Sequence, residues 1–525
     1  MSYQSAQRQK LTKDTGVFSW GFVDNVQNVD MAGQFSPYLR NARLDWQSIT
    51  IRPWHQLFND DLTAGDYPRG IGRYLRADPS GNVMVIRHNT DATHKLYTLT
   101  AWGTLTSIAT GADIASDNRM HFTNIADDVY CMNWVDDIGI LNGTTYTTPS
   151  FGIVNFAPAF SCVFDAKHWA SGWSTNSNKV YYSAINDYDW FGMAGSGQLT
   201  FQEQITWLAS NGQAIFYFTP NSVSMTGIGD VQDSWGTLYY VSRALQSSEW
   251  APCNASIVSA GSNIYFLSTG NTISMIAQGQ NVNWFEVIGL SDRPYAGISK
   301  IMSTLDVDQS DSFGYFLPDV MLIKWHLKTN GSSINDIVIV YDITKDKFLV
   351  DDRKYFYGGV NFEGKNYTIS MLEPKVYQDE YSQDDEWSAI PFEYHTKEFY
   401  ISDPTFKKIL WEARTLVDIN ELAELTQEIW IDWASVDTKT VDSDNIPVAA
   451  SGIGTLTVGE EAIGEWANDD DYKEIYILRT KGNLNKKGRK VQFRWVNGSL
   501  AGKVRLKDLW IKAEVLPAEA NNLTA

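Results

Sequence analysis

Apolar residues alternate with polar ones along most of the chain, in short runs separated by Gly, Asn, Asp and Ser. Three such runs are residues 83–86 (VMVI), 264–267 (IYFL) and 337–341 (IVIVY). A period of two places successive side chains on opposite faces of a strand, so the pattern predicts β-strands. Helical spacing is nearly absent. The best helical candidate, residues 419–425, is short and precedes a strand-like run, so we interpret it as a loop or a single turn.

Turn signals recur between about residue 70 and residue 375. They include Asn142-Gly143, Asn211-Gly212 and Asn330-Gly331. Many short antiparallel strands at even spacing are typical of a sandwich, a barrel or a propeller. At about 40–50 residues for each four-stranded blade, this length favours a β-propeller of about six blades.

A change in composition marks the end of the propeller. Acidic residues cluster among polar ones at Asp379, Glu380, Asp384, Asp385 and Glu386. We therefore predict an N-terminal segment over residues 1–70 that leads into the propeller, a β-propeller over 71–378, and a second domain over 388–525. Strand-like runs at 392–401, 409–417, 429–433, 491–496 and 504–515 predict a C-terminal β-sandwich, so the whole protein is expected to be all-β.

Composition narrows the possible functions. The 525 residues include 62 acidic and 42 basic ones, a net charge of −20, which argues against a general affinity for phosphate backbones or anionic lipid. The three cysteines, Cys131, Cys162 and Cys253, are too widely spaced for a disulfide framework or a cysteine-type zinc site. No secretion signal or apolar run of membrane-spanning length is present, so we expect synthesis in a cytosol and no membrane span.

Catalytic motifs of the common enzyme classes are missing from the sequence, and its seven histidines are dispersed. We expect no enzyme activity, no cofactor and no metal. One alternative stays open, because a propeller followed by a sandwich also occurs in glycoside hydrolases, which need only two carboxylates about 5–9 Å apart. The acidic pairs Asp127-Asp128, Asp136-Asp137 and Asp351-Asp352 lie beside predicted turns, where Asp commonly caps the backbone.

The densest aromatic region spans residues 169–191. Its members could stack on a carbohydrate or on single-stranded nucleic acid, or fill the gaps between propeller sheets. We favour packing. The predicted packing cluster comprises Trp169, Trp173, Tyr181, Tyr182, Trp190 and Phe191.

A basic stretch departs from the acidic average. Between residues 481 and 513 the single acid Asp508 stands against many lysines and arginines. Such a stretch could hold DNA, or it could dock on the acidic surface of a neighbouring copy or partner, for example the 379–386 segment. Alternation with apolar residues favours docking from a sheet face. The predicted subunit or partner interface comprises Lys486, Lys487, Arg489, Lys490 and Arg494.

Three passages together resemble a known family. They are residues 168–173 (HWASGW) with 178–191 (NKVYYSAINDYDWF), and residues 251–258 (APCNASIV), which precede a strand at 263–268. Residues 205–208 and 215–219 match the strand pair between these passages. The chain is similar over about residues 120–280 to tail nozzle, tail tubular or DNA-stabilisation hub proteins of short-tailed bacteriophages.

The resemblance implies a structural virion protein rather than an enzyme. Such a protein would form a ring of six copies that lines the DNA-ejection conduit and helps retain packaged DNA. Its partners would be itself, the head-to-tail adaptor, tail fibre or spike proteins, and double-stranded DNA that passes without sequence-specific binding. It would be made in the host cytoplasm and located in the virion tail. The alternative is a propeller-plus-sandwich glycoside hydrolase or a host-glycan-binding tail protein.

Overall fold

The computed structural model describes most of the propeller and the central strands of the C-terminal domain. The residues that it describes are 9–14, 38–44, 49–62, 67–88, 94–110, 114, 118–153, 156–189, 191, 195–228, 231–234, 237–245, 254–268, 270–279, 285–293, 298–352, 355–382, 391–396, 408–419, 424–432, 434–442, 460–462, 474–481, 487–488, 491–497 and 504–515.

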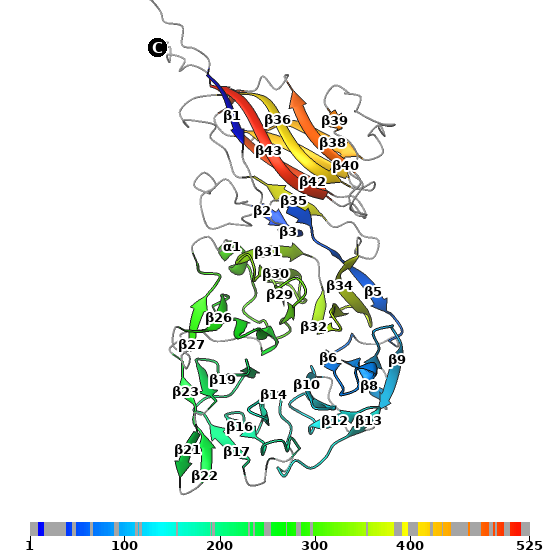
Figure 1. Cartoon of the computed structure of the whole chain (residues 1–525), viewed down its shortest axis with the longest axis vertical. Coiled ribbons are helices and arrows are strands. Elements are labelled where there is room, and N and C mark those ends of the chain that lie inside the picture. The colour runs from blue at the N-terminus through cyan, green and yellow to red at the C-terminus, as the bar shows by residue number, and fades with distance from the viewer. Residues whose placement is uncertain are drawn as a thin grey trace, which may run out of the picture.

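The described residues form an all-β protein with a β-propeller and a C-terminal β-sandwich (Figure 1). Seven four-stranded antiparallel sheets make up the described part of the propeller. The first three blades contain β6 (Gly70–Tyr74), β7 (Val83–Arg87), β8 (His94–Leu99) and β9 (Leu105–Ala109); β10 (His121–Ile125), β11 (Asp128–Met132), β12 (Gly139–Asn142) and β13 (Thr145–Thr147); and β14 (Phe160–Phe164), β15 (Lys167–Ser171), β16 (Lys179–Tyr182) and β17 (Gly197–Thr200).

The next three blades follow the same meander. They contain β18 (Trp207–Ser210), β19 (Ala214–Phe218), β20 (Val223–Gly227) and β23 (Arg243–Ala244); β24 (Val258–Ala260), β25 (Asn263–Leu267), β26 (Ile273–Gln278) and β27 (Phe285–Gly289); and β28 (Phe313–Leu317), β29 (Leu322–Leu327), β30 (Ile337–Asp342) and β31 (Lys347–Asp352). Short elements interrupt them: the hairpin of β21 (Val231–Ser234) and β22 (Thr237–Tyr240), the single turn α1 (Ser299–Met302), and the 3-10 turns η2 (Pro79–Gly81) and η3 (Asn254–Ser256).

The seventh blade closes the ring with a strand from the N-terminal segment. It consists of β32 (Phe356–Phe362), β33 (Lys365–Ser370), β34 (Val376–Ser382) and β5 (Trp54–Asn59). Strand β5 pairs antiparallel with β34, so Asn59 lies opposite Val376. The ring therefore holds one blade more than the length predicted. Tight turns make this possible, because only Ala126 and Asp127 separate β10 from β11.

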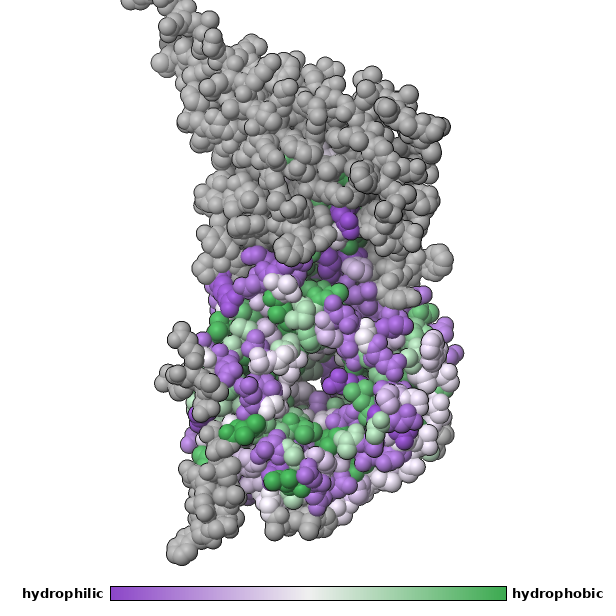
Figure 2. Space-filling model, in the orientation of Figure 1, coloured by the Kyte–Doolittle hydropathy of each residue, from purple (hydrophilic) through white to green (hydrophobic). Residues whose placement is uncertain are grey.

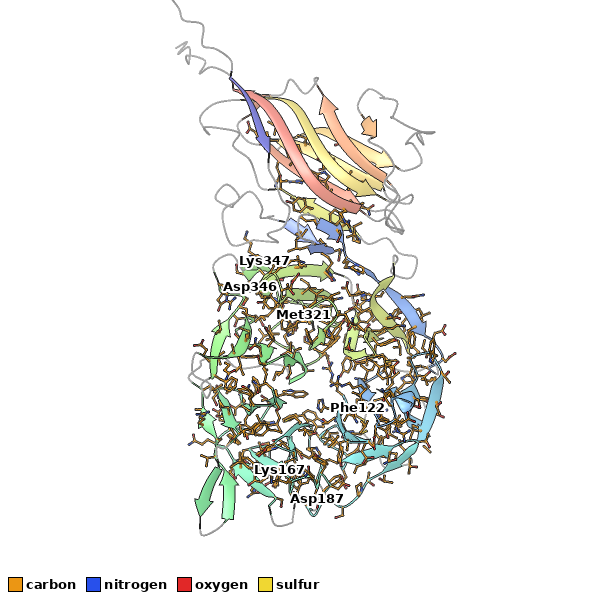
Figure 3. The ribbon with its side chains drawn as sticks, in the orientation of Figure 1. Phe122, Lys167, Asp187, Met321, Asp346 and Lys347 are labelled. Carbon is orange, nitrogen blue, oxygen red and sulfur yellow. The ribbon has the colours of Figure 1, made fainter. Side chains whose placement is uncertain are left out.

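The first strands of the blades lie at the centre of the ring, and all but β18 and β24 contact the first strands of both neighbouring blades. Glycine permits this close approach at two positions. A Cβ at Gly72 would lie 2.5 Å from Cβ of Phe122, and one at Gly359 would lie 2.8 Å from the Tyr315 ring. Phe122 lies beside the central opening (Figure 3). Figure 2 shows this opening, with hydrophilic and hydrophobic residues interspersed around it.

The C-terminal domain is built from two antiparallel sheets. An eight-stranded sheet contains β1 (Gln9–Asp14), β3 (Ala42–Leu44), β4 (Ile49–Ile51), β36 (Lys408–Ile419), β39 (Glu460–Ala462), β40 (Glu474–Lys481), β41 (Lys487–Gly488) and β43 (Val504–Val515). A five-stranded sheet contains β2 (Tyr38–Arg40), β35 (Phe392–His395), β37 (Glu424–Ile431), β38 (Ala434–Asp442) and β42 (Val491–Asn497). Buried Phe493 and Trp495 alternate with half-buried Arg494, as expected for a strand with one apolar face.

The predicted N-terminal segment is shared between the two domains. Strands β1 to β4 join the sheets of the sandwich, whereas β5 belongs to the propeller. The described chain thus runs from the sandwich through the propeller and back into the sandwich. One apolar core runs across the junction, because Leu39 and Ile49 belong to the same buried cluster as Trp325 of the propeller and Trp495 of the sandwich. Within the described residues, no helix is long and apolar enough to span a membrane.

Candidate functional site: the charged seam between propeller and sandwich

A buried ion pair joins the sandwich to the sixth blade. Arg43, on β3, donates from Nη1 and Nη2 to the two carboxylate oxygens of Asp351, on β31, over 3.0 and 2.8 Å. The same guanidinium also contacts Glu380 on β34. Burial alone would lower the pKa of Arg43, but the charges of Asp351 and Glu380 outweigh it and hold the pKa well above its usual value. This paired geometry fixes both the distance and the orientation of the two strands.

A second cation extends the seam into the propeller. Lys324, on β29, is fully buried and lies 2.5 Å from Asp379 of β34, and its ammonium also contacts Glu380. Two cations, Arg43 and Lys324, therefore share the carboxylate of Glu380. Since a buried charge without a partner is very costly, these groups hold blades six and seven and strand β3 in one arrangement.

Two further side chains contact Asp379. The Tyr315 hydroxyl, from β28, donates to it, and His55 Nδ1, from β5, lies 2.7 Å from its other oxygen. Burial raises the pKa of Tyr315 well above its ordinary value, and Asp379 raises it further. The phenol therefore stays protonated and donates. Because His55 and Asp379 lie on β5 and β34, the seam also spans the strand pair that closes the ring.

Asn41 connects the same region through the backbone. It has a φ of 52°, a left-handed conformation that Asn tolerates better than most residues. Its N–H donates to Val350 O at the edge of β31, and its Nδ2 donates to Pro391 O over 2.8 Å. Its Oδ1 accepts from Nε of buried Arg52 over 3.1 Å. Through its backbone and its side chain, this one buried residue thus connects the propeller with the two segments that link it to the sandwich. We refer to Arg43, Asp351, Lys324, Asp379, Glu380, Tyr315, His55 and Asn41 as the seam.

The seam corrects one sequence-based interpretation. We expected the 379–386 segment to present an acidic surface to the basic stretch of a neighbour. Asp379 and Glu380 instead face inward and pair with Lys324 and Arg43 of the same chain. The remaining acidic residues of the segment, 384–386, lie outside the described residues. The sequence held one signal of this arrangement: Lys324 interrupts the buried apolar strand β29.

The predicted aromatic cluster divides between two cores of the third blade. Trp169 and Tyr182 belong to one buried cluster, with ring centroids 4.7 Å apart. Trp173 and Phe191 belong to another, in which half-buried Tyr181 packs against the same core. Trp190 lies outside the described residues. The five described aromatic residues pack within the propeller, on opposite faces of one sheet.

The predicted basic interface is only partly described. Lys486, Arg489 and Lys490 lie outside the described residues, and of Lys487 only the backbone, in β41, is described. Arg494 lies on β42, where its guanidinium stacks 3.8 Å from the ring centroid of Trp430 within its own domain. Arg494 therefore packs against its own domain. That the basic stretch docks on a partner stays a prediction.

The acidic loop at 306–311 and the described cysteines have structural explanations within their own surroundings. In the loop at 306–311, the Asp308 N–H donates to the Asp306 carboxylate and the Ser310 N–H to that of Asp308, which are ordinary Asx turns. Burial raises the pKa of the Cys131 and Cys162 thiols, so both stay protonated. Across the described part of the chain, no group of three or more His, Cys, Asp or Glu is arranged to hold a metal ion.

Comparisons with known proteins yield only distant structural likeness. Neither a scan against protein-family models nor a search of curated proteins finds a match. Among solved structures, the computationally designed Ika8 protein matches with a TM-score of 0.35 and 10% identity, covering 62% of this chain and 99% of that chain. YCF48 from Cyanidioschyzon merolae matches with a TM-score of 0.38 and 10% identity, covering 62% and 98%. The fold assignment therefore rests on the strand topology of this chain.

Proposed function

We propose that this protein is a structural subunit of a short-tailed bacteriophage tail, of the nozzle, tail tubular or hub type. Six copies would close into a ring around the DNA-ejection conduit and help retain packaged DNA. The adaptor and the tail fibre or spike proteins would contact it in the virion. The sequence resemblance over residues 120–280 is the basis for choosing this class of protein.

The observation that supports a structural role is the seam. Arg43, Asp351, Lys324 and Glu380 are buried ions that join two domains through residues far apart in the chain. A ring subunit must transmit force between its domains without changing their relative orientation. A continuous apolar core and a paired ionic seam supply that rigidity, since separating the domains would expose both.

The net charge of −20 fits the same role. DNA that moves through a conduit must not be held, and each Lys or Arg contact with phosphate adds affinity. An acidic wall repels the duplex and keeps it centred.

The test is the mass and shape of the particle that the full chain forms with a matching head-to-tail adaptor. We expect closed rings of six copies in negative-stain microscopy and in mass measurement. A chain that stays monomeric with every tail component would contradict the proposal. If that monomer also hydrolysed or bound members of a polysaccharide panel, the glycan-directed alternative would replace it.

A further inference from the structure

Four side chains gather at one end of the central opening. The first strands of the blades run in the same direction around a propeller, so their starting ends meet on one face. Arg69 directly precedes β6, Arg119 precedes β10, and Tyr357 is the second residue of β32. Tyr67 lies two residues before Arg69. These four residues, from three consecutive blades, are referred to as the mouth cluster.

The mouth cluster forms a continuous series of cation–ring contacts and one edge-to-face ring contact. The Arg69 guanidinium lies 4.2 Å from the centroid of the Tyr67 ring, and that ring lies 5.5 Å from the Tyr357 ring. On the other side, the Arg119 guanidinium lies 4.4 Å from the Tyr357 centroid. Stacking on aromatic faces holds both guanidinium groups in place, and it leaves the N–H groups of Arg69 available to a ligand.

Arg119 reaches across the ring. Its Nη1 donates to Ser312 O, next to β28 of the sixth blade, over 3.1 Å, and its Nη2 donates to Tyr357 O of the seventh. Since Arg119 itself comes from the second blade, it passes the first blade to make these contacts. Its guanidinium is therefore fixed at the end of the opening rather than on the outer rim.

Neither guanidinium of the mouth cluster forms an ion pair within the described chain. No described carboxylate lies within ion-pair distance of Arg69 or Arg119, whereas Arg43 and Arg293 are both paired. The Nε of Arg69 is buried and has no hydrogen-bond partner among the described residues. Arg69 and Arg119 lie on the two sides of the Tyr67–Tyr357 ring pair, and the nearest negative charge that acts on Tyr357 is that of Asp311. A bound anion would compensate the remaining positive charge.

Tyr357 adds a directed donor between the two cations. The residue is only 4% exposed, and its hydroxyl, which makes no hydrogen bond to a described residue, is not fully buried. Burial raises the pKa of the Tyr357 phenol, so the hydroxyl keeps its proton and can donate. Arg69 and Tyr357 therefore offer donors without an acceptor among the described residues, and Arg119 adds a positive charge that two backbone carbonyls hold in place.

We propose that the mouth cluster is a binding site for the oxyanion group, carboxylate or phosphate, of a small ligand that enters the central opening. Guanidinium groups match both oxyanions in geometry, and a phenol can supply a further hydrogen bond. A small ligand fits better than a polyanion, because the acidic surface of the protein repels extended negative charge. This site does not depend on the tail role, and it would be present in a monomer.

The test is isothermal titration of the full chain at low salt with three probes: inorganic phosphate, glucuronate and glucose. We expect glucuronate or phosphate to bind, and the one that binds identifies the oxyanion. Glucose should not bind. Arg69→Gln should weaken binding about tenfold or more, because a hydrogen bond from a charged donor is lost, and Tyr357→Phe should weaken it severalfold.

Arg76→Gln is the matched control. Arg76 is exposed and follows the opposite end of β6, and its guanidinium lies 5.7 Å from the centroid of the Tyr74 ring. It is therefore a similar cation beside a ring, at the end of β6 away from the mouth cluster. Its substitution should leave affinity unchanged. Absence of binding by both anions, or equal loss of affinity in the Arg69 and Arg76 variants, would overturn the proposal. Arg119 is left intact, because it also holds two backbone carbonyls.

Discussion

Arg43 and Asp351 lie 308 residues apart in the chain and form two parallel hydrogen bonds of 3.0 and 2.8 Å. Arg43 belongs to the sandwich through β3, and Asp351 belongs to the propeller through β31. Both side chains are nearly or fully removed from solvent. The domain junction of this protein is therefore an electrostatic contact in the interior, and it should respond to substitution as buried ion pairs do.

Asp351→Asn should lower the free energy of unfolding by about 3–5 kcal/mol, because it removes one partner of a buried pair and leaves Arg43 with less compensation. Urea unfolding followed by tryptophan fluorescence measures this change. The matched control is Arg293→Gln, which breaks the exposed Arg293–Asp346 pair and should cost less than about 1 kcal/mol. Equal effects of the two substitutions would contradict the importance assigned to the seam.

Trp169→Ala should destabilise the third blade by about 3–5 kcal/mol. Trp169 is fully buried, its Nε1 donates to Phe164 O over 3.0 Å, and it contacts the Tyr240 ring edge-on. Thermal unfolding measures the loss. Trp102→Ala provides the comparison, since Trp102 is 94% exposed and its removal should change the melting temperature little. Unchanged melting for Trp169→Ala, together with lost glycan binding, would favour a recognition role for this aromatic region.

Acid should destabilise the fold through His168. Burial lowers the pKa of His168 to about 4, although Tyr188 O accepts a hydrogen bond from its Nδ1. An unfolded histidine has a pKa of about 6.5, so between these values the unfolded state binds more protons. Stability contributed by neutral His168 is complete above pH 6.5 and falls as the pH drops toward 4, by up to about 3 kcal/mol.

His168→Asn tests this pH dependence. Asn cannot titrate in this range, and its amide can still donate toward Tyr188 O. The free energy of unfolding, measured by urea titration at pH 7 and pH 4.5, should fall less for the variant than for the wild type. The same pH dependence in both proteins would assign the acid sensitivity to other groups.

Gly72→Ala should destabilise the inner ring by about 1–3 kcal/mol, because the new methyl group meets the Cβ of Phe122 at 2.5 Å and no rotamer change can relieve that contact. Gly289→Ala serves as the control, since its Cβ would lie 3.4 Å from the nearest atom, the end of the Asp292 side chain. A melting temperature equally affected by both substitutions would mean that loss of glycine flexibility, rather than crowding at the ring, has been measured.

Charge reversal at Lys486, Lys487 and Lys490 should impair ring or tail assembly and leave the isolated fold intact, because these residues are predicted to dock on an acidic partner surface. Circular dichroism would verify the fold, and sedimentation with the adaptor would report assembly. Normal assembly with altered DNA retention would instead identify the basic stretch as a DNA contact.

The sequence by itself determined the fold class and the positions of several strands. Alternating apolar residues located β7, β25 and β30, and residues 504–515 were predicted as a strand with the bounds of β43. This was possible because the period of two is a local property, set by which face of each strand is buried. The same alternation indicated that Trp495 faces a core and Arg494 does not.

Only the tertiary structure decided which strands pair and which charges meet. Closure of the ring by β5 and β34 joins residues from the two ends of the propeller, and β1 to β4, which precede the propeller, pair with strands that follow it. Arg43, Lys324 and Asp379 are ordinary charged residues in the sequence, and so are Arg69 and Arg119. Contacts between distant segments decide whether these side chains are buried and what they pair with. No local pattern in the sequence encodes such contacts, because charged side chains are mostly exposed unless the fold pairs them.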